Sequence, residues 1–149
     1  MRTRAAIALL ALGLGGPARA ALGEPASSLD ADRKALSAAR GVTTPGDAYS
    51  VEELVSHGNV VREYVSKAGV VFALAWRGQS PPDLGPLLGG YASEYRQAAA
   101  RARGRPGHRY RKLETPRLVV ESFGHMRDLG GRVYAPSLLP PGVTPDEIR

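Results

Sequence analysis

Residues 70–77 are apolar on both faces of an extended chain, and this run limits the possible folds more than any other feature. Its two sides are formed by Val70, Phe72, Leu74 and Trp76 and by Val71, Ala73 and Ala75. A strand that is apolar on both faces lies in the middle of a sheet or beneath a helix. We therefore expect an antiparallel sheet with this segment as its central strand.

Four further segments have the residue composition of strands. Segments 49–55 and 60–66 precede the central strand, and segments 118–123 and 132–135 follow it. Because segment 60–66 carries Arg62-Glu63, at least one of its faces is expected to face water. The order predicts a three-stranded meander followed by a hairpin, and so a sheet of about four to five strands.

The strongest helical pattern lies in residues 84–102, where apolar side chains recur at intervals of three and four residues. Asp83 stands at the position of an N-terminal cap, and Pro86 falls within the first turn, where proline is tolerated. The Gly89-Gly90 pair costs about 1 kcal/mol per glycine relative to alanine, so it marks a bend or a close approach to the sheet. We expect one main helix that covers one face of the sheet.

A shorter helix is expected over residues 29–40, after the capping residues Ser27 and Ser28. Residues 42–47 follow as a turn-rich linker, and Thr144 begins a capped turn near the end of the sequence. The predicted fold class is therefore α+β: a small antiparallel sheet of about four to five strands packed against one main helix, with a short N-terminal helix.

The first twenty residues have the layout of a secretory signal peptide. Arg2 and Arg4 are followed by an uncharged run over residues 5–16, and Ala18-Arg19-Ala20 places small residues at the cleavage positions. This apolar run is about twelve residues long, whereas a membrane-spanning helix needs roughly twenty. We expect cleavage after Ala20, a single globular domain over residues 21–149, and a periplasmic or secreted product.

The expected domain is long enough to bury about two-thirds of its unfolded surface without disulfide bonds, and the sequence contains no cysteine. Zinc-thiolate sites, thiol nucleophiles and thiol redox chemistry are therefore excluded. The sequence also lacks a P-loop, a dinucleotide fingerprint, a zinc-protease motif and a serine-hydrolase elbow. No catalytic residue, metal ligand or cofactor is predicted.

Basic residues gather between Arg96 and Arg117, where eight of them face a single acid. Arginine binds phosphate and carboxylate through two parallel hydrogen bonds, so this segment is the predicted surface for an anionic partner. The alternative is a solvated helix end and loop. The predicted binding residues are Arg101, Arg103, Arg105, Arg109, Arg111 and Lys112.

The partner of this surface depends on where the protein works. Loss of Arg2, Arg4 and Arg19 with the signal peptide lowers the formal charge from +6 to +3. An exported protein rarely meets nucleic acid, so the prediction favours an anionic envelope component, such as lipid head groups or lipopolysaccharide phosphates, or an acidic protein surface.

Two other classes of function remain open. His57, in the turn His57-Gly58-Asn59, and His125 are interpreted as polar turn residues. An enzyme with a site near His125, Arg127 and Asp128 is the alternative, and it requires a concave site with a carboxylate beside the histidine. A third hypothesis is an oligomeric structural component that pairs through the edges of its sheet.

Four blocks of the sequence resemble, in their order, a bacterial family labelled domain of unknown function 2844. They are Val-Val-Arg-Glu-Tyr-Val-Ser-Lys-Ala-Gly-Val-Val-Phe-Ala-Leu-Ala-Trp at 60–76, Pro-Asp-Leu at 82–84 with Leu-Leu-Gly at 87–89, Gly-His-Met at 124–126, and Tyr-Ala-Pro-Ser-Leu-Leu-Pro at 134–140. The resemblance implies a small exported protein of Gram-negative bacteria, and the family has no established activity, cofactor or site. Together these observations predict a non-enzymatic, envelope-associated binding or accessory protein.

Overall fold

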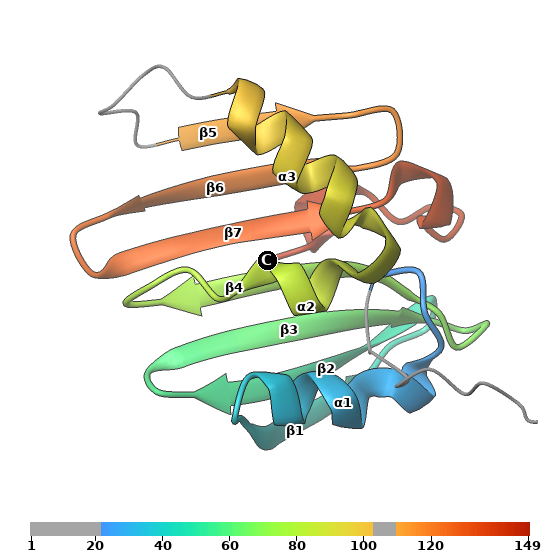
Figure 1. The fold of residues 1–149 in the computed structure, drawn as a ribbon. Coiled ribbons are helices and arrows are strands. Elements are labelled where there is room, and N and C mark those ends of the chain that lie inside the picture. Colours follow the sequence, from blue (N-terminus) through green and yellow to red (C-terminus); the bar gives the residue numbers. More distant parts are fainter. Residues whose placement is uncertain (1–21, 103–109) are drawn as a thin grey trace, which may run out of the picture.

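The structure is a computed structural model that describes residues 22–102 and 110–149 (Figure 1). In these residues one seven-stranded antiparallel sheet has the strand order β1-β2-β3-β4-β7-β6-β5. The strands are β1 (Ala39–Pro45), β2 (Tyr49–Ser56), β3 (Asn59–Ser66), β4 (Val71–Gly78), β5 (Tyr110–Glu114), β6 (Val119–His125) and β7 (Asp128–Tyr134).

The α-helices of the described residues lie on one face of this sheet (Figure 1). They are α1 (Leu29–Ala35), α2 (Leu84–Leu88) and α3 (Ala92–Arg101), with 3₁₀ turns at Ala26–Ser28 and Gly89–Tyr91. The outer face is partly covered by the C-terminal segment, which contains 3₁₀ turns at Pro136–Leu138 and Pro145–Glu147 and buries Ile148. None of these helices has the length and apolar character that crossing a bilayer requires.

The two halves of the sheet repeat one topology. α1 is followed by β1 to β4, which run from one edge of the sheet to its centre, and α2 and α3 are followed by β5 to β7, which run from the other edge to the centre. The halves meet where β4 pairs with β7. Residues 71–76 of β4 are all buried, which confirms the central strand that the apolar run predicts.

Each face of the sheet has its own apolar core. Leu74 and Trp76 of β4 pack under the helices with leucines of α2, among them Leu87 and Leu88. On the outer face, Phe72 and Tyr64 pack with Ile148 of the C-terminal segment. The ring centroids of Tyr64 and Phe72 are 6.1 Å apart in an edge-to-face arrangement, a geometry that aromatic pairs favour.

A cross-strand row of charges follows the outer face on both sides of Ala75. Arg62 pairs with Ala75 and Glu53 in the strand register, and Arg132 pairs with Ala75 and Glu121. Arg62 Nε donates to Glu53 Oε1 at 2.7 Å, and Arg132 forms an ion pair with Glu121. Each arginine of this row is therefore matched by an acid of the neighbouring strand.

The prediction of a four- to five-stranded sheet is wrong, because the described sheet has seven strands. β1 occupies residues that were expected to be the end of a helix and a linker, and β5 lies in the basic segment. Both are edge strands with mostly exposed side chains. Such strands bury too little to show apolar alternation, which is the signal that identified the interior strands.

The prediction of one main helix is also wrong in detail. The chain leaves α2 at Gly89, where φ is 45°, and begins α3 three residues later, so the glycine pair marks a bend as expected. The Asp83 cap is confirmed, since its Oδ1 accepts a hydrogen bond from Gly85 N at 2.9 Å. The capping box at Thr144 is present as well, while the first helix ends at Ala35 rather than at residue 40.

Candidate functional site

A cleft of about 1030 Å³ lies between the pair α2–α3 and the ends of β4, β6 and β7. Trp76 of β4, Leu84 of α2 and Tyr95 of α3 contribute its apolar and aromatic lining. Two of its lining residues carry a positive charge, Arg96 on α3 and Arg111 on β5. A concave site with apolar walls and a few placed polar groups is typical of ligand-binding sites.

Two glycines of β7 lie against aromatic rings of the neighbouring strands, and one of them, Gly130, lines the cleft. Gly131 pairs with Trp76, and a Cβ atom built on Gly131 would lie 2.2 Å from Cζ2 of the indole. A Cβ atom on Gly130 would lie 2.7 Å from Cε2 of Phe123, whose ring is half exposed. Aromatic rings from both neighbouring strands therefore lie directly over the backbone of β7, where any side chain would displace them.

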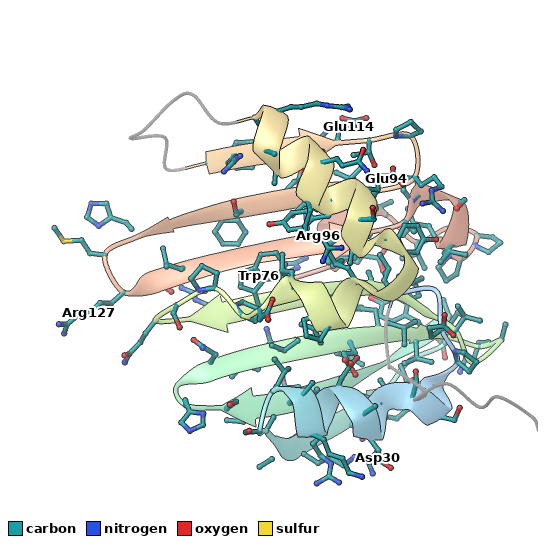
Figure 2. The ribbon with its side chains drawn as sticks, viewed as in Figure 1. Asp30, Trp76, Glu94, Arg96, Glu114 and Arg127 are labelled. Carbon is teal, nitrogen blue, oxygen red and sulfur yellow. The ribbon has the colours of Figure 1, made fainter. Side chains whose placement is uncertain are left out.

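Arg96 and Arg111 differ from two other basic residues near α3, Arg117 and Lys112, which have acidic partners. Arg117 is paired with Glu94 at 2.7 Å, and Lys112 is paired with Glu114 at 3.0 Å. Within the described part of the chain, Arg96 and Arg111 take part in none of the ion pairs. Figure 2 shows Arg96 beside α3, close to Trp76 in this view. Two guanidinium groups from different elements thus border one cleft.

The predicted binding residues that the structure describes lie in two different depressions of the surface. Arg103, Arg105 and Arg109 lie outside the described residues. Arg101 and Lys112 line a different depression of about 610 Å³, on the α3–β5 side. Of the three described members, only Arg111 lines the cleft, so these members do not form one surface.

Arg96 was part of the basic segment but not among the predicted binding residues. Apart from the glycines, no pattern in the sequence indicated a cleft. Gly130-Gly131 indicated only an interruption between two strands. The missing information is the strand register, which places Gly131 beside Trp76 and opposite Ser122.

A second cavity, of about 620 Å³, lies on the outer face of the sheet. Arg62, Arg77, Arg132 and Arg149 line it, and the first three of these arginines have acidic partners. Most of its positive charge is therefore compensated within the fold.

The residues of the alternative enzyme site are spread over an exposed hairpin. Arg77 binds Asp128 through two hydrogen bonds of 2.8 Å, and this contact lowers the pKa of the Asp128 carboxyl. His125 is exposed at the end of β6, and Arg127 is exposed in the adjoining turn with φ at 64°. The Asp128 carboxylate is thus committed to Arg77, which weighs against its service as a partner of His125.

His57 occupies the turn between β2 and β3, as expected, with φ at 46°. Ser56 Oγ lies 2.9 Å from His57 Nδ1, but the same hydroxyl donates to the carbonyl of Leu36 at 2.7 Å. A serine held by a backbone carbonyl at an exposed turn lacks the oriented base of a hydrolase. Among the described residues, no three histidine or carboxylate side chains are grouped to hold a metal ion.

A buried pair of acids was missed by the sequence analysis. Segment 60–66 was expected to have at least one wet face because of Arg62-Glu63, but Glu63 itself is 0% exposed beneath α1, and Asp32 of α1 is 2% exposed. Burial, reinforced by the neighbouring acid Asp32, raises the pKa of Glu63 to about 9. Glu63 alternates with the buried residues Val61 and Val65, and this alternation was the available signal.

The fold and the cleft together define an α+β protein with a cleft on the helical side of its sheet. The chain belongs to the family described as Protein of unknown function (DUF2844), whose model matches residues 18–148. The resemblance found in the sequence is thereby confirmed. Neither the curated proteins nor the solved structures contain a significant match.

Proposed function

We propose that this protein is an exported, non-catalytic binding protein that holds an anionic group, attached to an apolar body, in the cleft beneath α2 and α3. One observation carries the proposal: two arginines without acidic partners in the described part of the chain border a cleft that is lined by aromatic rings.

The apolar lining of the cleft suits the apolar body of such a ligand, and its two arginines suit the anionic group. Tyr95 offers partly exposed aromatic surface beside the nearly buried Trp76 and Leu84, and removal of apolar surface from water contributes about 25 cal/mol per Å². Arg96 and Arg111 offer planar donors that match the oxygens of a phosphate or a carboxylate. An amphiphilic anion from the cell envelope, such as a lipid phosphate, combines these features.

Export is part of the proposal and rests on residues 1–20, which lie outside the described residues. Intact-mass analysis of the protein recovered from the periplasm checks it. The expected mass corresponds to a chain that begins at Ala21, and a product that still begins at Met1 contradicts cleavage.

The binding proposal is tested by calorimetric titration with dodecyl phosphate below its micelle concentration. In the double variant Arg96→Gln/Arg111→Gln we expect the affinity to fall by about 100-fold, because a hydrogen bond to a charged group contributes about 1.5–3 kcal/mol. The matched control is Arg101→Gln/Lys112→Gln, which removes the same charge outside the cleft and is expected to retain the affinity.

Two outcomes oppose the proposal. If both double variants lose affinity equally, binding follows net charge and not the cleft. If neither variant loses affinity, the arginines do not hold the anion.

A further inference from the structure

α1 lies on the sheet beside α2 and away from α3 (Figure 1), and it contributes one of two neighbouring buried carboxyl groups, Asp32 on α1 and Glu63 on β3. Glu63 lies in the middle of β3, on the face that the helices cover, and its side chain is completely buried. Asp32 lies in the middle of α1 and is almost as well buried. A carboxylate without water is strongly disfavoured unless it is paired or neutralised.

Three of the four carboxyl oxygens of this pair have no hydrogen-bond donor among the described residues. In the part of the chain that the structure describes, Asp32 Oδ2 and both Glu63 carboxyl oxygens lack a partner. Two ionised carboxylates only accept hydrogen bonds, whereas a protonated carboxyl also donates one. A proton held between Asp32 and Glu63 therefore supplies the donor that the surrounding protein does not.

The charged neighbours do not neutralise the pair. In the strand register Glu63 faces another acid, Glu52 of β2, which accepts a hydrogen bond from Thr43 Oγ1 at 2.6 Å. On its other side Glu63 faces Leu74 of β4. The α2 segment Leu84–Leu88 contains no titratable residue.

The charges of α1 itself are directed elsewhere. Arg33 lies 3.5 Å from Asp30 in a partly exposed ion pair, and Lys34 is exposed. No cation in the described residues is paired with Asp32 or Glu63.

We propose that Asp32 and Glu63 form a proton-binding site that holds α1 against the sheet, so that loss of the shared proton releases the helix. The direction of the pKa changes agrees with this geometry. Burial raises the pKa of Asp32 to about 7, and burial together with the neighbouring acids Asp32 and Glu52 raises that of Glu63 to about 9.

A proton fits this site better than a metal ion does. Calcium takes six to eight oxygen ligands, whereas two carboxyl groups supply at most four. No third acidic or histidine side chain is grouped with them to form a metal site in residues 22–102 or 110–149.

The rest of the contacts of α1 allow it to move as a unit. Before the helix, Gly23 N donates to Val71 O at 2.8 Å, which fixes the incoming chain to β4. After the helix, Ser56 Oγ holds the carbonyl of Leu36. Asp32 lies between these two attachments. Ionisation of the pair therefore favours undocking of the helix while its ends remain attached.

Thiol labelling tests the proposal directly, because the chain contains no cysteine. Leu29→Cys places a thiol at a buried position of α1, and Ala35→Cys places one at an exposed position of the same helix. The ratio of their labelling rates by Ellman's reagent corrects for ionisation of the thiol. We expect this ratio to rise with pH above about 6, by about tenfold per unit if one proton is released.

Two variants decide the origin of this rise. The double variant Asp32→Asn/Glu63→Gln cannot ionise and should keep the labelling ratio constant within about twofold. Asp30→Asn removes an exposed acid of the same helix and should leave the rise unchanged. Where Leu29→Cys prevents folding, protection of the amides of residues 29–35 against hydrogen exchange, relative to those of β4, gives the same readout. A ratio that is independent of pH, or a rise that persists in the double variant, overturns the proposal.

Discussion

At the scale of single residues, Gly131 leaves the space that the indole of Trp76 occupies beside the cleft. Gly131 is buried beside the Trp76 indole, and its position would also bring a Cβ atom within 2.6 Å of the carbonyl oxygen of Glu121. Neither neighbour can easily withdraw, because one is a buried ring and the other is backbone. The sequence shows that these residues are glycines, but only the strand register shows what they accommodate.

We expect Gly131→Ala to lower the free energy of unfolding by about 1–3 kcal/mol, because overpacking forces the indole or the strand to shift. Urea unfolding, followed by the fluorescence of Trp76, measures this change. The matched control is Gly90→Ala, where an added Cβ atom meets nothing within 4 Å. That substitution should be neutral or stabilise the fold by up to about 1 kcal/mol. Equal destabilisation by both would contradict the packing argument.

At the scale of elements, burial decides which parts of the fold could be predicted. β4 was identified because its side chains are apolar and buried on both faces. β2 and β3 were identified because turn residues separate these strand-like segments from each other and from β4. β1 was missed because it is exposed almost throughout. The burial of Glu63 was not anticipated, because the charges of Arg62-Glu63 were taken only as a sign that at least one face of the strand is wet, although residues 61 and 65 on the same side as Glu63 are buried.

The acid pair between α1 and β3 predicts an unusual dependence of stability on pH. The pKa of Glu63 in the folded protein is raised from 4.5 to about 9, so between these values the folded state holds a proton that the unfolded state has released. The contribution of Glu63 to stability is therefore fully present below about pH 4.5, and this contribution is lost as the pH rises through about 9.

We expect Glu63→Gln to raise the free energy of unfolding at about pH 8, on the order of 2 kcal/mol, and to have much less effect at about pH 5. Urea unfolding at both pH values measures the difference. Glu53→Gln serves as a control, since Glu53 is paired with Arg62 at a partly exposed position. A native protein that is more stable at the higher pH would contradict a protonated Glu63.

At the scale of the whole molecule, two similar half-sheets meet at β4 and β7, and the cleft lies beside this junction under α2 and α3. The sequence predicted an anionic partner for the basic segment, but it could not show that Arg96 and Arg111 border one cleft while Arg101 and Lys112 line another depression. Side chains of α3 and β5 are brought together by tertiary packing, which charge patterning does not encode.

The most direct test of binding in the cleft uses Trp76, which is the single tryptophan of the chain and lines the site. We expect titration with dodecyl phosphate to change the Trp76 emission and to saturate at one ligand per protein. The Arg96→Gln/Arg111→Gln variant should require about 100-fold more ligand for the same change. Saturable binding of the ligand without any change in Trp76 emission would place it elsewhere and contradict the account.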